Sequence, residues 1–201
     1  MNQRSIAAAS IGIFVLVIAG AIAWYFLHPS RQLQTASQSP IVGKAQVGQT
    51  APVFQAATTG GLFDLAKTDK PVFLEVFATW CPHCQRETAV IDKLYTAYGS
   101  RVAFVAVSGS GTAMDGTSES SPADVLNFAQ QFNVHYPIAY DPLIREPNNP
   151  KSVANLYLQG GFPTFAVIGK DKKVAYLNSG EISYNDLAAE LNNVLSVSRH
   201  G

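Results

Sequence analysis

The stretch that decides the fold is VFLEVFATWCPHC, residues 72 to 84. Its first six residues are apolar except for Glu75, a pattern typical of a strand that is buried on both faces of a sheet. The segment after Cys84 has apolar residues at helical spacings, so we expect a helix there. Cys81 and Cys84 therefore stand where a strand passes into a helix. The unpaired N–H groups and the positive dipole of a first helical turn favour a thiolate at that point.

The two cysteines are the only ones among the 201 residues. A structural cross-link between Cys81 and Cys84 would close too short a loop to add much stability. A zinc site needs about four ligands, and the other histidines and carboxylates show no ligand spacing. Covalent haem attachment would require a histidine directly after Cys84, where Gln85 stands. We therefore interpret the pair as a redox-active dithiol that forms a Cys81–Cys84 disulfide, with no metal and no cofactor.

The residue types around the pair suggest separate roles. Cys81, at the junction, is predicted to form a mixed disulfide with the substrate, which Cys84 resolves. Glu75 is predicted to exchange a proton with Cys84, because burial would raise the pKa of its carboxyl; the alternative is a carboxylate at the strand edge that faces solvent. His83 is predicted to stabilise the Cys81 thiolate and so to make the disulfide a stronger oxidant; the alternative is an exposed residue without energetic effect. Glu87 is interpreted as an ordinary surface carboxylate.

The N-terminal part predicts a membrane anchor. Residues 6 to 27 carry no charged side chain, and at about 1.5 Å per residue they match a hydrocarbon core of roughly 30 Å. A cleaved signal peptide is the alternative, because residues 21 to 23 (AIA) resemble a cleavage site. Both interpretations place the folded part outside the cytoplasm, in the periplasm or at the cell exterior. The expected organisation is a cytoplasmic tail at 1–5, a transmembrane signal anchor at 6–27, a flexible linker at 28–47 and a folded domain at 48–201.

The folded domain reads as an α/β sandwich of three layers with a central mixed sheet. Strands and helices alternate at first, and a hairpin and a last helix follow. The expected strands cover residues 72–77, 102–107, 136–140, 164–168 and 174–177, and the expected helices begin after residue 84 and near residues 122, 152 and 183. Residues 108 to 121 are rich in Gly, Ser and Thr, which predicts a mobile surface loop or, alternatively, a functional lid. Charges balance at 14 basic and 14 acidic residues, so no basic patch indicates nucleic acid binding.

The motif ATWCPHC at residues 78 to 84, together with GFPT at 161 to 164, resembles the active-site segment and the cis-proline loop of the thioredoxin superfamily. The opening GQTAPVF at 48 to 54, a helix-plus-strand insertion before residue 161 and the N-terminal apolar segment are similar to the TlpA/ResA branch of membrane-anchored members. The resemblance covers residues 48 to 196. It implies a thioredoxin-like three-layer fold.

The same resemblance implies roles for residues around the cysteines. Pro163 would be cis and would lie against the disulfide, and the backbone of Phe162 would pair with a substrate polypeptide. Trp80 and Pro82 would complete the substrate-binding surface. Glu75 occupies the place of the buried acid of the superfamily.

The resemblance also implies a function, but the branch of the superfamily and the dipeptide between the cysteines indicate opposite directions of electron flow. The TlpA/ResA branch is commonly reducing, for example in cytochrome c maturation, whereas Pro82-His83 between the cysteines is similar to the periplasmic oxidase DsbA. We expect a membrane-tethered extracytoplasmic thiol–disulfide oxidoreductase that acts on exported cysteine-containing proteins and is recycled by a redox partner in the membrane. The oxidase or isomerase direction is favoured because the dipeptide acts directly on the thiolate; the alternative is a disulfide reductase.

Two hypotheses from other classes are weaker. A copper delivery module would need a distant histidine near the cysteines, and His135 is the plausible one, but the family with that function has a wider cysteine spacing. A peroxidase of the peroxiredoxin class would need a threonine three residues before the reactive cysteine, where Ala78 stands.

Overall fold

The computed structural model describes residues 44–118, 121–146 and 149–197 of the chain. The predicted cytoplasmic tail, the signal anchor at 6–27 and the linker up to residue 43 lie outside these described residues. Within the described ranges, no helix is both long enough and apolar enough to cross a bilayer.

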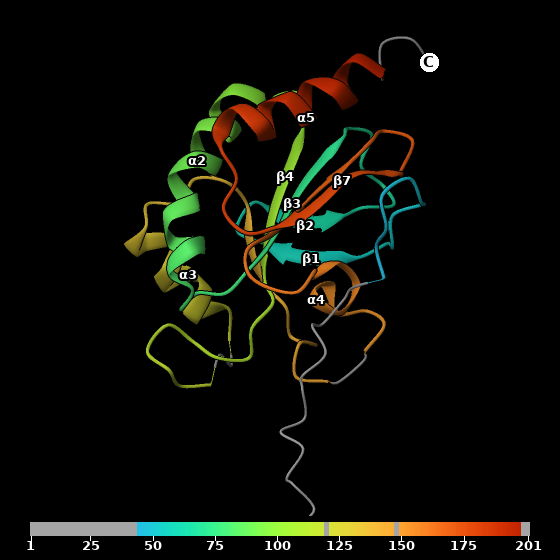
Figure 1. Ribbon diagram of the computed structural model, residues 1–201. Coiled ribbons are helices and arrows are strands. Elements are labelled where there is room, and N and C mark those ends of the chain that lie inside the picture. Colours follow the sequence, from blue (N-terminus) through green and yellow to red (C-terminus); the bar gives the residue numbers. More distant parts are fainter. Residues whose placement is uncertain (1–43, 119–120, 147–148, 198–201) are drawn as a thin grey trace, which may run out of the picture. The chain divides into compact units, whose positions relative to one another are not determined.

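In the described part of the chain, seven strands form one mixed sheet with the order β2-β1-β5-β4-β3-β6-β7 (Figure 1). The central strand β3 runs parallel to β4 and antiparallel to β6. All six residues of β3 are buried, which explains its nearly continuous apolar sequence. The mixed sheet predicted from the sequence is therefore confirmed. The strands are β1 (Gln55–Thr58), β2 (Gly61–Asp64), β3 (Val72–Phe77), β4 (Ala103–Ser108), β5 (Ile138–Tyr140), β6 (Thr164–Ile168) and β7 (Val174–Ser179).

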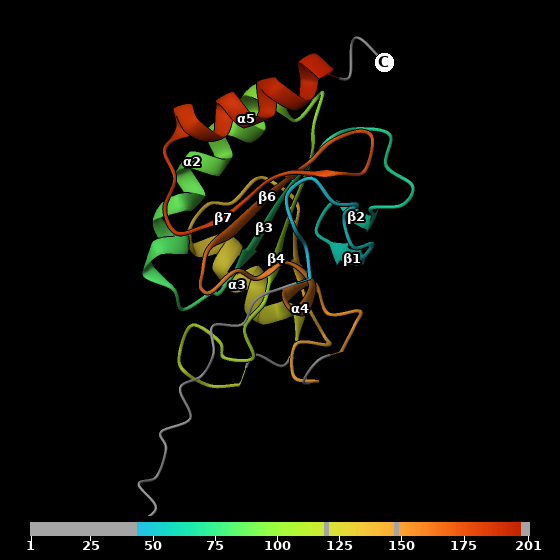
Figure 2. The same ribbon diagram turned by 45° about the vertical axis from the view of Figure 1, so that its right-hand side comes forward.

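Helices cover both faces of this sheet. One face carries α2 (Pro82–Tyr98), α3 (Pro122–Gln131) and α5 (Tyr184–Val197), and the other carries the short α4 (Val153–Tyr157). Figure 2 shows α2 and α5 side by side on their face of the sheet. Both α2 and α3 begin with a proline, whose fixed φ suits the first helical position.

The direction of Glu75 follows from the alternation of side chains along β3. Phe73 and Phe77 belong to the core beneath α2 and α5, whereas Leu74 and Val76 belong to the core beneath α4. Since successive residues of a strand point to opposite faces, Glu75 shares the face of Phe73 and Phe77. The one charged residue of β3 is thus directed at the helix that carries the cysteines.

Two segments are better packed than the sequence predicts. The folded unit includes residues 44 to 47, which we assigned to the linker: Ala45 is 2% exposed and its N–H donates to the carbonyl of Leu156. This contact joins residues far apart in the chain, so the local sequence carries no sign of it. In the loop after β4, Ser110 and Ala113 are buried, so this segment is not wholly a surface loop.

Candidate active site

Cys81 and Cys84 lie at the beginning of α2. Cys81 is the N-cap residue, Pro82 is the first helical residue, and the carbonyl of Cys81 accepts the first helical hydrogen bond from the N–H of Gln85 (3.0 Å). Both cysteines are free thiols. Cys81 keeps 4% of its surface exposed and Cys84 has none. A substrate can therefore approach Cys81 and not Cys84.

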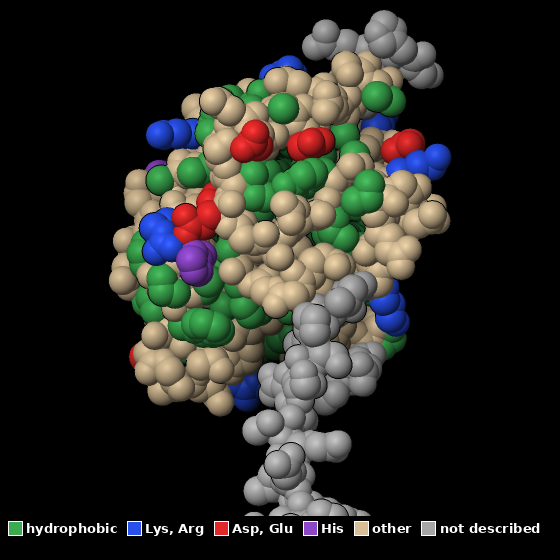
Figure 3. Space-filling view, viewed as in Figure 1, with side chains coloured by type: hydrophobic (Ala, Val, Ile, Leu, Met, Phe, Trp, Pro, Cys, Tyr) green, Lys and Arg blue, Asp and Glu red, His purple; other side chains and the backbone are tan. Residues whose placement is uncertain are grey.

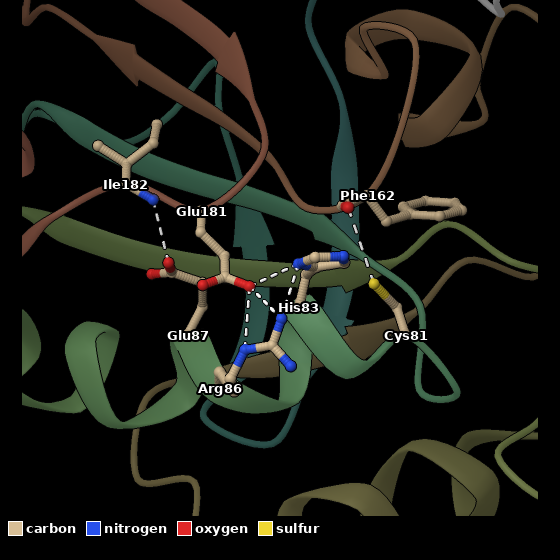
Figure 4. A network of polar contacts seen from close by, with 7 residues as sticks. All are labelled: Cys81, His83, Arg86, Glu87, Phe162, Glu181 and Ile182. Atoms are coloured by element: carbon tan, nitrogen blue, oxygen red, sulfur yellow. Dashed lines mark hydrogen bonds and ion pairs between the residues drawn. The ribbon is translucent and has the colours of Figure 1, made fainter.

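The proline loop lies against Cys81. The Cys81 Sγ is 3.7 Å from the carbonyl oxygen of Phe162, and the Phe162–Pro163 peptide bond is cis, as the resemblance implies. Gly180, after β7, donates its N–H to the carbonyl of Pro163 (2.8 Å) and ties the loop to the sheet. Figure 4 shows the carbonyl of Phe162 directed at the sulfur of Cys81.

Apolar side chains surround the exposed edge of Cys81. Trp80 is 42% exposed, its indole N–H donates to the Oγ of Ser110 (2.8 Å), and its ring packs edge-on against Phe162. Pro82 is exposed, whereas Pro163 is buried beneath the loop. Figure 3 shows hydrophobic side chains gathered on this side of the molecule, beside a histidine flanked by acidic and basic groups. The four predicted substrate-binding residues thus lie on the segments around one thiol.

Glu75 lies beneath the cysteine pair and is 2% exposed, so the alternative of a solvent-facing carboxylate is wrong. Burial, and then the negative charge of Glu87, raise the pKa of the Glu75 carboxyl well above its ordinary value. Burial also raises the pKa of the Cys84 thiol, and the charge of Glu75 raises it further. The charge of Glu75 therefore favours the protonated form of Cys84, which places a proton donor or acceptor beside the buried thiol.

Glu87 is buried, so the prediction of an ordinary surface carboxylate is wrong. It is 4% exposed, and one of its carboxylate oxygens accepts a hydrogen bond from the N–H of Ile182 (3.0 Å), while the other meets no partner among the described residues. Burial raises the pKa of this carboxyl. Its spacing from Cys84 and Ile91, at three and four residues, places it on the inner face of α2 and could have revealed its burial.

Tyr136 is a further buried polar group that the sequence did not identify. Its side chain is 2% exposed, and its hydroxyl has no partner of full hydrogen-bond geometry in the described part of the chain. It nevertheless lies close enough to Glu75 to lower the pKa of that carboxyl, against the larger effect of burial. Burial, and then the charge of Glu75, raise the pKa of the phenol.

His83 is exposed and takes part in an ionic network (Figure 4). Its Nδ1 lies 2.5 Å from the Oε1 of Glu181 and 2.8 Å from the Nη2 of Arg86. Arg86 also donates to the same oxygen of Glu181 through Nε (3.0 Å) and through Nη2. Arg86 first, and His83 second, lower the pKa of the Glu181 carboxyl. Within the described residues, His83 makes no hydrogen bond to Cys81.

His135 lies away from the cysteines. Its Nδ1 lies 2.8 Å from a carboxylate oxygen of Asp92, whose other oxygen accepts the N–H of His135 (3.0 Å). Asp92 stands eight positions beyond Cys84 on α2, or about 12 Å along the helix. The described residues contain no group of three or more potential metal ligands. This geometry gives the copper hypothesis no support.

A separate pocket of about 750 Å³ opens between the turn that joins β6 to β7 and the C-terminal half of α5. None of the residues named around the cysteines lines it. The cysteine pair therefore lies outside this pocket.

Comparisons with known proteins agree with this geometry. The model of the Redoxin family matches residues 46–195. The chain is 30% identical over 152 residues to the thiol-disulfide oxidoreductase ResA of Geobacillus thermodenitrificans, covering 74% of this chain and 78% of that protein. It is 25% identical over 182 residues to the thioredoxin-like protein YneN of Bacillus subtilis, covering 90% and 94% of the two chains. A solved structure of a putative thiol:disulfide interchange protein DsbE from Chlorobium tepidum superposes with a TM-score of 0.60 at 22% identity, over 75% of this chain and 99% of that one.

Proposed function

Because this chain belongs to the Redoxin family and is a thiol–disulfide oxidoreductase of the thioredoxin superfamily, similar to ResA, we propose that it exchanges disulfides with exported, cysteine-containing proteins. The observation that carries the proposal is the position of the Cys81 thiol, which faces the carbonyl of Phe162 beside Pro163 with Cys84 beneath it. A backbone carbonyl next to the reactive sulfur can pair with an extended polypeptide. Small thiols would not use that contact.

The exchange proceeds through a mixed disulfide. In the oxidising direction, a substrate thiolate attacks the Cys81 sulfur of the Cys81–Cys84 disulfide, and Cys84 leaves with the electron pair of the broken S–S bond. A second substrate thiolate then attacks the substrate sulfur of the mixed disulfide and expels Cys81 as a thiolate. The substrate loses two electrons and gains a disulfide, and the domain is left as a dithiol.

Glu75 supplies the proton for the first of these steps. A Cys84 thiolate would be buried, and its surroundings raise the pKa of the thiol, so the leaving sulfur must be protonated as it departs. The raised pKa of Glu75 lets this carboxyl hold a proton at a higher pH than an exposed carboxyl would. In the reverse direction the Glu75 carboxylate takes the same proton back and frees Cys84 to attack.

For the direction of electron flow we propose oxidase or isomerase activity. The support is the Pro82-His83 dipeptide, because a histidine close to Cys81 stabilises the thiolate and hence the reduced form. The second candidate is a disulfide reductase, which the ionic network favours because Glu181 brings a negative charge beside His83. A redox partner in the membrane would recycle the domain in either direction.

We further propose that the domain is tethered by residues 6 to 27 and works outside the cytoplasm. The length and the apolar character of this segment support an anchor. If the proposal is correct, the full-length chain stays with the membrane fraction after a high-salt wash.

The test is turnover of a peptide with one disulfide by the full-length chain in mild detergent. Cys81→Ser should abolish turnover, and Glu190→Gln, on α5, should leave it unchanged. An active Cys81→Ser variant would contradict the mechanism. Equilibration with a glutathione buffer then gives the direction: a potential of about −120 to −180 mV indicates an oxidase or isomerase, and about −270 mV or below indicates a reductase.

A further inference from the structure

We propose that Glu181 is a positioning residue that holds His83 and limits how strongly this imidazole stabilises the Cys81 thiolate. The proposal rests on the role of His83 in the proposed function and deepens it. Glu181 lies in the segment between β7 and α5, 98 residues after His83 in the chain. No feature of the CPHC motif itself indicates this partner.

The segment that carries Glu181 is fixed on both sides. Before it, the N–H of Gly180 donates to the carbonyl of Pro163 (2.8 Å). After it, the N–H of Ile182 donates to the buried carboxylate of Glu87 on α2 (3.0 Å). Three consecutive residues therefore contact, in turn, the proline loop, the exposed start of α2 and its buried face. A carboxylate held in this way can orient an imidazole that is itself exposed.

The contact occupies the nitrogen of His83 that faces Glu181. With the proton on Nδ1 the ring donates to Glu181, and in the other tautomer Nδ1 accepts from Arg86. In both cases only Nε2 is left for a contact with Cys81. In the described part of the chain, the Cys81 sulfur lies within hydrogen-bond distance of the carbonyl of Phe162. The imidazole of His83 is thus held in place by Glu181 and not by a contact with Cys81.

The negative charge of Glu181, like this restraint on His83, lowers the stability of the Cys81 thiolate. A carboxylate near a thiolate disfavours the thiolate, and here it also pairs with the cation of Arg86. The negative form of Cys81 is itself one of the influences that raise the pKa of Arg86. Replacing Glu181 with a neutral residue would free both His83 and Arg86 to act on Cys81. The reduced form would then gain stability, and the disulfide would become a stronger oxidant.

The experiment measures the equilibrium between the full-length chain and glutathione. In this reaction the reduced domain and one glutathione disulfide give the oxidised domain and two reduced glutathione molecules, so two electrons pass from the domain to glutathione. Glu181→Gln should shift the equilibrium constant about five- to tenfold toward the reduced domain. A tenfold change corresponds to about 30 mV for a two-electron couple. Glu190→Gln, a carboxylate on α5 away from this network, is the matched control and should cause no shift.

A double-mutant cycle separates positioning from a simple charge effect. If Glu181 acts mainly through His83, Glu181→Gln shifts the equilibrium clearly more in the native background than in the His83→Ala background, where only the effects of its charge and of Arg86 remain. An equal shift in both backgrounds overturns the proposal, because Glu181 would then act on Cys81 directly. No shift in the native background, or a shift toward the oxidised domain, also overturns it.

The cycle also distinguishes this proposal from the function on which it rests. If His83→Ala alone leaves the equilibrium unchanged, the role given to His83 in the proposed function fails, and this proposal fails with it. If His83→Ala shifts the equilibrium but Glu181→Gln does not, only the role of Glu181 is refuted. Since Glu181 and His83 are exposed side chains, both variants are expected to fold, and thermal unfolding of each variant checks this.

Discussion

The Sγ of Cys81 and the carbonyl oxygen of Phe162 lie 3.7 Å apart, although 81 residues separate them in the chain. The contact sets the reactive sulfur beside a backbone group that can bind an extended polypeptide. Cys84, three residues further along the helix, is fully buried beneath it. A substrate that pairs with the proline loop therefore presents its own sulfur to Cys81 and leaves Cys84 to resolve the intermediate.

Because Cys81 attacks and Cys84 resolves, we predict that Cys84→Ser traps substrates as mixed disulfides. With Cys84 removed, a substrate disulfide attacked by Cys81 forms a mixed disulfide that no second thiol of this chain can resolve. We expect the mixed disulfide with a single-disulfide peptide to accumulate as the main product, detectable by mass spectrometry without reductant. Cys81→Ser is the matched control and should give no adduct. Equal adduct formation in both variants would contradict the assignment of Cys81 as the attacking residue.

The close packing behind the proline loop predicts a strict requirement for glycine at position 109. A Cβ at Gly109 would lie 2.6 Å from Val76, 2.9 Å from Ala154 and 3.4 Å from Phe162. Gly109→Ala should therefore lower the free energy of unfolding by about 1 to 3 kcal/mol, as overpacking of a core does. Gly111→Ala is the control in the same loop, where a Cβ would make only ordinary contacts with Arg145. Urea unfolding measures both, and similar stability of the two variants would refute the packing argument.

The raised pKa of Glu75 predicts a free energy of unfolding that depends on pH. Its pKa in the folded state is raised above the ordinary value of 4.5, so between these two values the folded state binds more protons than the unfolded state. Stability must fall as pH rises through that window. Glu75→Gln removes the titrating carboxyl, and with it this loss of stability at higher pH. The variant should match the native reduced protein near pH 4 and exceed its free energy of unfolding near pH 8, because each pH unit within that window costs the native protein up to about 1.4 kcal/mol.

Urea unfolding at several pH values measures this difference. Asp69→Asn is the control, because it removes an exposed carboxylate and leaves Glu75 in place. A Glu75→Gln variant that is less stable than the native protein at pH 8 would show that the ionised carboxylate is satisfied in the folded state, against the burial of this side chain.

Local sequence patterns predicted the elements that carry the site. The apolar run of residues 72 to 77 indicated β3, the helical spacing after Cys84 indicated α2, Pro122 indicated the start of α3, and the hairpin of β6 and β7 followed from its central turn. These features depend on neighbours within a few residues, where spacing determines which face a side chain occupies. The pairing of the cysteines with the loop at Pro163 came from resemblance, because no local pattern joins segments eighty residues apart.

The contacts that tune the site could not be predicted in the same way. Glu181 reaches His83 across 98 residues, and Trp80 reaches Ser110 across 30. Their side chains are ordinary polar residues in loops, and only the fold decides which of them meet. Glu87 is different, since its helical spacing from Cys84 contained the information. Its charge, by contrast, is typical of a surface position.

The phenol of Tyr136 adjoins the carboxyl of Glu75 without a full hydrogen bond. Because this contact lowers the pKa of Glu75, Tyr136→Phe should raise that pKa further and keep the carboxyl protonated to higher pH. In the oxidising direction the protonated form donates to Cys84, so the rate falls as pH rises through the pKa of Glu75. The falling limb should therefore move to higher pH in the variant, while the rising limb, set by the substrate thiol, stays in place.

Single-turnover mixing of the oxidised full-length chain with a reduced dithiol peptide, over a range of pH, measures both limbs. Tyr184→Phe, which removes a hydroxyl from a partly buried tyrosine at the start of α5, is the control and should leave the profile unchanged. Stability should change by less than about 1 kcal/mol in Tyr136→Phe, because the hydroxyl that is removed has no full partner to lose. A falling limb that stays in place would mean that Tyr136 does not act on Glu75, and a falling limb that moves to lower pH would mean that the phenol favours the protonated carboxyl.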